Sequence, residues 1–181
     1  SGYDGQDRSY LEAFGTGATG KEEEIFRAVK GIIGSEDFRN WTEAFSGIAW
    51  RLHPASSIDD FLARAKLESL PMNQRRMAMD AIAFIPTRAA SQAMQTLAQL
   101  DTPLKADATW WAMNRANNHW RDFDLRTELK ERGIYDPDKI VIQEVATPEP
   151  DPAMETLKIE DALLLKGDAE RGKITVSRCV M

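Results

Sequence analysis

Apolar residues return every three or four positions along most of residues 1–136, and this spacing predicts α-helices that each bury one face. The first predicted helix follows Asp7, which can cap it, and the glycine-rich run 15–20 ends it. The second starts at Lys21 with three glutamates in its first turn and stops at Gly34. Its expected buried stripe is Ile25, Phe26, Val29, Ile32 and Ile33.

From residue 35 onward the spacing repeats in pairs of short helices that proline separates. Pro54 divides the first pair and Pro86 divides the second, in which Asn73 and Thr87 are placed to cap the two helices. The predicted helices cover about 40–52, 57–68, 73–85 and 87–100. Because the two prolines lie 32 residues apart (86 − 54), the pairs share one period. We therefore expect an all-α fold in which antiparallel helix pairs stack as a short HEAT- or armadillo-like α-solenoid.

Two more helices are expected at the end of this repetitive region. A long one over 104–120 would cap the stack, and a shorter one over 124–132 would end at Gly133. Both predictions again depend on helical spacing of the apolar residues.

The chain changes character after these helices. Residues 139–145 alternate apolar and polar side chains like one extended strand, and the proline-rich residues that follow are typical of a stiff linker. Further on, Asp168 can cap a last short helix. The predicted organisation is a helical-repeat domain over 1–146, a linker over 147–158 and a separate C-terminal piece over 159–181.

The composition is that of a globular protein, with 43% hydrophobic and 29% charged residues. The formal net charge is −6 and no segment gathers lysine and arginine without acids nearby, so nucleic acid is not an expected partner. No apolar run approaches the roughly 20 residues that a membrane-spanning helix needs. A single cysteine excludes an internal disulfide framework and a metal site built from several cysteines.

The glycine run 15–20 matches the dinucleotide-binding pattern G-x-G-x-x-G. That pattern binds a nucleotide only between a strand and a helix, and the segment before Gly15 reads as helical. With Lys21 the run also approaches a phosphate-binding loop, but Glu22 stands where a hydroxyl should ligate magnesium. We therefore interpret the run as a flexible connection between two helices.

The remaining candidate chemistry is sparse. Acidic pairs occur at 36–37 and 59–60, where acids at a helix start complement the helix dipole. His53 and His119 have no second ligand at helical spacing, so no metal site is expected. No nucleophile with a neighbouring base is evident, and we expect no catalytic residues in this chain.

The segment 110–120 is the most unusual, because it places three tryptophans among amide and guanidinium groups. The favoured interpretation is that Trp111 packs inward while the polar residues cap neighbouring loops. The alternative is a carbohydrate- or peptide-binding site, because indole rings stack on sugars while amides bond to their hydroxyls. Its residues would be Trp110, Asn114, Asn118 and Trp120.

Residues 166–181, KGDAERGKITVSRCVM, resemble the opening of a c-type cytochrome domain, in which a G-D-x-x-x-G-K helix leads into C-x-x-C-H. Four other segments resemble the helical region ahead of that cytochrome in one family. The family comprises membrane-bound dehydrogenase and haem-binding proteins of the planctomycete, verrucomicrobia and Bacteroidetes type. The segments are 3–13, 81–87, 110–115 and 133–136.

The resemblance implies a larger exported, periplasmic parent with a propeller similar to that of quinoprotein sugar dehydrogenases and a terminal cytochrome that carries haem c. Cys179 matches the first thioether cysteine, but the second cysteine and the axial histidine are not among the 181 residues. We therefore expect these residues to hold no haem and no other cofactor.

The expected role that follows is a non-catalytic scaffold or interaction module that positions the cytochrome for electron transfer. Its partners would be the flanking domains of the same polypeptide and a redox partner protein. The binding site at 110–120 is the alternative.

Overall fold

The computed structural model describes residues 3–136, 139, 158, 160, 164 and 166–172, in which the regular structure is helical without any strand. The predicted all-α fold is confirmed for this part of the chain. Two compact units divide the chain, Ser1–Ile140 and Val141–Met181. Most of the predicted strand and linker, and Cys179, lie outside the described residues.

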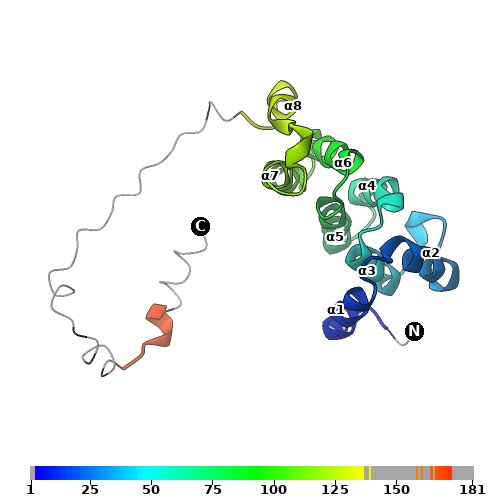
Figure 1. Ribbon diagram of the computed structural model, residues 1–181, viewed down its shortest axis with the longest axis horizontal. Helices are drawn as coiled ribbons and strands as arrows, with labels where there is room; N and C mark the ends of the chain where they lie inside the picture. Colours follow the sequence, from blue (N-terminus) through cyan, green and yellow to red (C-terminus); the bar gives the residue numbers. More distant parts are fainter. Residues whose placement is uncertain are drawn as a thin grey trace. The chain divides into compact units, whose positions relative to one another are not determined.

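The first unit consists of short helices that succeed one another in chain order in Figure 1. The α-helices are α1 (Arg8–Gly17), α2 (Glu22–Ile33), α3 (Glu43–Leu52), α4 (Ile58–Lys66), α5 (Met72–Ala83), α6 (Arg88–Gln99), α7 (Lys105–Ala116) and α8 (Leu125–Glu131). Single 3-10 turns stand between some of them, at η1 (Phe38–Asn40), η2 (Ala55–Ser57) and η3 (Arg121–Phe123).

These helices form two layers. Along one side α3 packs on α1, α5 on α3 and α7 on α5, and on the other side α6 packs on α4 (Figure 1). The layers are joined where α2 meets α3, α4 meets α5 and α6 meets α7. Helix α8 joins the second layer through Arg88 and Gln99 of α6, which bond to Glu128 and to the Arg132 carbonyl. We call the layer of α1, α3, α5 and α7 the odd layer.

The core lies between the two layers. Its large side chains include Phe45 and Ile48 of α3, Met79 and Ile82 of α5, and Met94 of α6, each at most 1% exposed. Buried alanines accompany them in α3, α5, α6 and α7 and let the helices approach closely. Since burial of one such large side chain stabilises by roughly 1.5–3 kcal/mol relative to exposure, this interface is the main source of stability.

Side-chain capping explains where three of the α-helices start. Side-chain oxygens of Asp7, Thr42 and Thr87 accept hydrogen bonds from backbone N–H groups in the first turns of α1, α3 and α6. In the second unit Asp168 accepts from the Arg171 N–H at 3.0 Å, so this predicted cap is confirmed. The prediction for Asn73 is wrong, because α5 already begins at Met72 after Pro71, and Asn73 lies inside the helix.

Two other expectations differ from the structure. Helix α1 continues through Gly15 to Gly17 instead of ending at the glycine run. Gly15 is needed there because the Arg51 side chain crosses α1 at this position and leaves no room for a Cβ. Ile32, predicted to be buried, is 79% exposed, because it lies at the edge of an open apolar hollow between α1, α2 and α3 and no further helix covers it among the described residues.

Helix α7 ends at Ala116, before the predicted limit. The chain turns there, and the backbone N–H of Trp120 bonds to the Arg115 carbonyl at 2.9 Å. This turn folds the indole ring of Trp120 back into the core. Gly133, with φ +66°, follows α8 as predicted. None of the helices among the described residues has the length and apolarity needed to span a bilayer.

Candidate functional site

A continuous row of aromatic rings crosses the odd layer from α3 to α7. The ring centroids of Trp50 and His53 are 5.9 Å apart, those of His53 and Phe84 are 5.0 Å apart, and those of Phe84 and Trp111 are 5.5 Å apart. Trp110 extends the row, 4.8 Å from Trp111. We call these five residues the aromatic row. Trp110 is 55% and Phe84 is 38% exposed, so part of the row faces solvent.

The helix ends explain why these rings meet. His53 follows α3 in the left-handed conformation, with φ 48°, and Phe84 follows α5 at the equivalent place one helix pair later. Trp110 and Trp111 lie in α7, the next helix of the odd layer. The helices α3, α5 and α7, with the residues that end α3 and α5, therefore each contribute at least one ring.

Two arginines lie over the aromatic row. The Arg8 guanidinium is 5.0 Å from the Trp50 ring, and that of Arg115 is 4.4 Å from Phe84 and 4.7 Å from Trp111. Such stacking is favourable because ring faces carry negative charge density. The row therefore combines five aromatic rings with two guanidinium groups, one over Trp50 and one over Phe84 and Trp111.

Arg115 is unusual for a buried arginine. It is 8% exposed, its Nη1 lies 3.0 Å from His119 Nδ1, and its Nε has no hydrogen-bond partner. Burial lowers the pKa of this guanidinium. A buried cation without a carboxylate is costly, and it marks a place where a further polar partner would be stabilising.

His53 is the titratable group at the centre of the row. Burial between aromatic rings lowers the pKa of His53 to about 4, and the positive charges of Arg51 and Arg115 add to this effect. The imidazole is therefore neutral near pH 7, and its Nε2 atom is buried without a hydrogen-bond partner.

Asp80 of α5 is the hydrogen-bond partner of one ring of the aromatic row. Its carboxylate accepts a 2.8 Å hydrogen bond from the indole N–H of Trp111, which fixes that ring. Burial raises the pKa of Asp80, and the indole bond partly offsets the effect. Nearby, Arg76 forms a 3.0 Å ion pair with Asp107, which ties α5 to α7.

Two cavities border the aromatic row. One, of about 340 Å³, lies beside Trp50 between α1, α3 and α5, and Arg8, Arg76 and Asp80 contribute polar groups to it. The other, of about 420 Å³, lies beside His53 and Phe84. Both volumes fall in the range of sites that accept small molecules or side chains.

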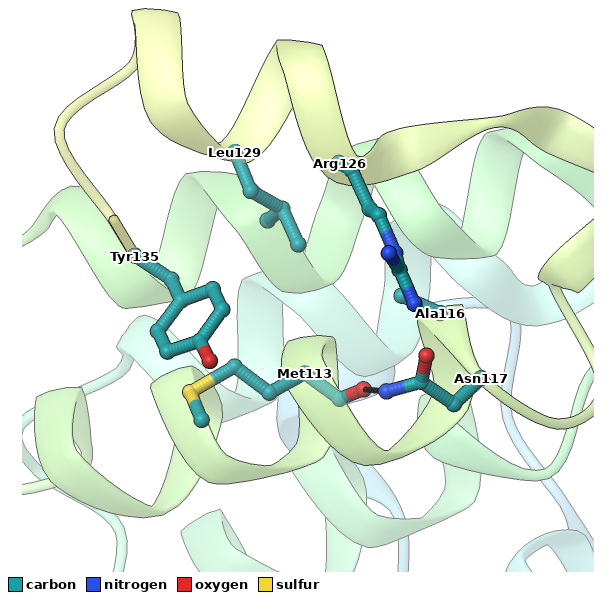
Figure 2. Close-up of a pocket in the computed structure, with 6 residues that line it drawn as sticks. All are labelled: Met113, Ala116, Asn117, Arg126, Leu129 and Tyr135. Carbon is teal, nitrogen blue, oxygen red and sulfur yellow. Dashed lines mark hydrogen bonds between the residues drawn. The ribbon is translucent and has the colours of Figure 1, made fainter. Parts of the chain in front are cut away.

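A third, smaller pocket of about 170 Å³ lies between α7 and α8. Figure 2 shows Met113 and Ala116 of α7 and Asn117, which follows α7, on one side, with Leu129 and Arg126 of α8 opposite. Tyr135, from the turn after α8, closes one end. The pocket is separate from the aromatic row, since it shares no lining residue with it.

The structure separates the four residues of the predicted binding segment. Trp120 is fully buried and donates its indole N–H to the Ile85 carbonyl at 2.9 Å, so it cannot contact a ligand. The amide of Asn118 bonds to the Asn114 carbonyl at 2.9 Å. Trp110 alone presents a ring to solvent.

Three of the acidic residues noted in the sequence form ion pairs with basic side chains of the fold. Asp37 pairs with Arg39, while Glu36 and Asp60 both pair with Lys30. Within the described residues no three histidine, cysteine or acidic side chains converge as metal ligands. Cys179 lies outside that part of the chain.

Sequence reasoning missed the aromatic row. Its members come from three separate segments of the chain, but one signal was present: an aromatic ring lies one or two residues before each of the two helix-breaking prolines, His53 before Pro54 and Phe84 before Pro86. Comparisons with protein-family models, with curated proteins and with solved structures found no match to this chain.

Proposed function

We propose that the first unit is a non-catalytic interaction module, a short HEAT- or armadillo-like α-solenoid whose aromatic row binds a partner polypeptide. The observation that carries the proposal is that one row of rings and guanidinium groups spans α3, α5 and α7 with Trp110 and Phe84 partly exposed. Aromatic and arginine side chains are the types that dominate protein interfaces.

The layered packing supports the same role. Each odd helix contacts the next, so a partner that lies along the odd layer meets several helices at once. The buried core behind this layer keeps the rings at fixed spacing, which lowers the entropic cost of binding.

In the larger protein that the resemblance implies, the partner is the c-type cytochrome domain that follows this chain or a redox protein that docks with it. The module would then hold the cytochrome at a fixed place for electron transfer in an exported, periplasmic enzyme. The part of the proposal that concerns haem rests on residues 166–181 and Cys179 alone.

NMR of the isotope-labelled 181-residue chain tests the proposal. A haem-loaded cytochrome domain of the proposed parent, begun at Lys166 so that it keeps Cys179 and its haem-attachment motif, is added, and the indole N–H signals are followed. We expect the Trp110 and Trp111 signals to move saturably, while Trp120, buried against Ile85, does not. A double change of Trp110→Ala and Phe84→Ala should weaken binding at least about tenfold.

Two outcomes would reject the proposal. If the residues encoded after Met181 do not complete C-x-x-C-H, the cytochrome is not the partner. If they do and no indole signal moves, the aromatic row is not its docking surface.

The carbohydrate-binding alternative retains less support. Trp120 is buried, so of the two tryptophans in the predicted sugar site only Trp110 is exposed, and its ring neighbour Trp111 is partly buried against the core. The same NMR experiment with glucose or galactose distinguishes the two, because sugar stacking would shift Trp110 without any cytochrome present.

A further inference from the structure

The pocket between α7 and α8 has an apolar interior and a polar rim. Leu129 is 1% exposed and forms its floor, with Met113, Ala116 and the Tyr135 ring as walls (Figure 2). Arg126 and Asn117 stand together at the rim, and the Asn117 amide is held by a 3.0 Å hydrogen bond to the Met113 carbonyl.

The Arg126 charge is available to a ligand. The acid nearest along the same helix, Glu128, is already paired with Arg88 and Arg132. Arg126 itself forms no ion pair or hydrogen bond within the part of the chain that the structure describes. A guanidinium presents its N–H groups in a planar fork that matches a carboxylate.

The size of the pocket restricts what it can hold. Its volume of about 170 Å³ is below the roughly 300–1,000 Å³ of sites for drug-sized ligands. A haem, a nucleotide or a disaccharide therefore does not fit, whereas a group of the size of one leucine side chain does.

We propose that this pocket binds a carboxylate joined to a small, branched apolar group. The apolar group packs on Leu129 and Met113, and the carboxylate pairs with Arg126 beside Asn117. Two sources share this chemistry: a free short-chain carboxylic acid and the C-terminal residue of a polypeptide. The proposal does not depend on the aromatic row.

The test uses the full 181-residue chain with ¹³C-labelled methionine and leucine methyl groups. The probes are 4-methylpentanoate, its uncharged amide 4-methylpentanamide, and N-acetylleucine. We expect 4-methylpentanoate or N-acetylleucine to shift the Met113 and Leu129 methyl signals saturably, and the amide to bind at least about tenfold more weakly, as loss of a charge-assisted hydrogen bond implies.

Variants of the chain test whether the methyl shifts come from binding in this pocket. Arg126→Gln should weaken binding about as much as the amide does. Arg121→Gln is the matched control: Arg121 is also an exposed arginine but lies outside the pocket and next to Asp122, so binding should not change. Ala116→Leu keeps the charge but fills the interior, and it should abolish the shifts.

The probes also separate the two sources. Tighter binding of N-acetylleucine favours a polypeptide C-terminus, and equal or tighter binding of 4-methylpentanoate favours a free acid. The proposal is overturned if neither acid gives saturable shifts up to roughly 20 mM, well above the affinity expected of so small a ligand. It is also overturned if Arg126→Gln and Arg121→Gln behave alike.

Discussion

Two buried arginines each lie against aromatic rings, and their surroundings differ. Arg64 of α4 is 1% exposed and lies 5.3 Å from the Trp41 ring. It donates to Ser46 Oγ at 3.0 Å, to Gln74 Oε1 at 3.1 Å and to the Phe38 carbonyl. Arg115 of α7 stacks on two rings, but His119 is its only hydrogen-bond partner among the described side chains.

The difference indicates different roles. Burial lowers the pKa of both guanidinium groups, so each carries a desolvation cost. At Arg64 three acceptors from η1, α3 and α5 offset that cost, and the arginine joins these elements. At Arg115 the cost is offset only in part, and the site lies in the aromatic row. Arg64 is thus satisfied within the fold, whereas the partly satisfied Arg115 fits the partner-binding role that we propose for the aromatic row.

The largest expected effect comes from Arg64→Met. The change leaves the Ser46, Gln74 and Phe38 oxygens without their donor, and it should lower the free energy of unfolding by about 3–5 kcal/mol. Urea denaturation followed by circular dichroism measures it. Arg39→Met, at an exposed arginine, is the control and should leave the free energy of unfolding almost unchanged. A loss below about 1 kcal/mol at Arg64 would remove the distinction between the two arginines.

The next effect concerns His53 and pH. Its folded pKa of about 4 lies below the ordinary value near 6.5, so the folded chain binds fewer protons than the unfolded chain between these values. His53 therefore makes its full contribution above pH 6.5, and stability should fall by about 3 kcal/mol as pH drops toward 4.

Variants isolate this pH dependence. Asparagine tolerates the left-handed backbone at this position. His53→Asn should therefore remove the decrease in the free energy of unfolding between pH 6.5 and 4, as measured by urea denaturation at several pH values. His119→Asn should leave it in place. An NMR titration in which the His53 ring signals move near pH 6.5 would contradict the assignment.

A smaller effect is expected from Arg115→Met. Loss of the stacking on Phe84 and Trp111 costs stability, but removal of a poorly satisfied buried charge recovers part of it, so the net change should be about 1 kcal/mol or less. The same urea experiment applies. A loss equal to that of Arg64→Met would mean that Arg115 is also a structural element.

The smallest effect is expected at Trp110. With 55% of its surface exposed, Trp110→Ala should change the free energy of unfolding by less than about 0.5 kcal/mol. Thermal unfolding measures the change. A near-neutral result makes the variant suitable for the cytochrome titration, while a loss above about 2 kcal/mol would assign Trp110 to the core.

Local features of this chain were predictable from its sequence. Asp7, Thr87 and Gly133 act within one helical turn of their own positions, so their capping roles follow from residue type and spacing. Asn73 was wrongly predicted to be the N-cap of α5, because Pro71 can also precede a helix start. When two residues that favour a helix start lie one or two positions apart, the sequence does not decide which of them is used.

By itself, the sequence determined the all-α class, most of the helices and the positions where they break, because periodicity and capping are short-range properties. The tertiary structure alone decided that His53, Phe84 and Trp111 form one row, that Trp120 is buried while Trp110 is exposed, and that Arg126 meets an apolar pocket. The physical reason is that these relations join residues more than ten positions apart or depend on where a turn redirects the chain, and helical spacing carries no information about either.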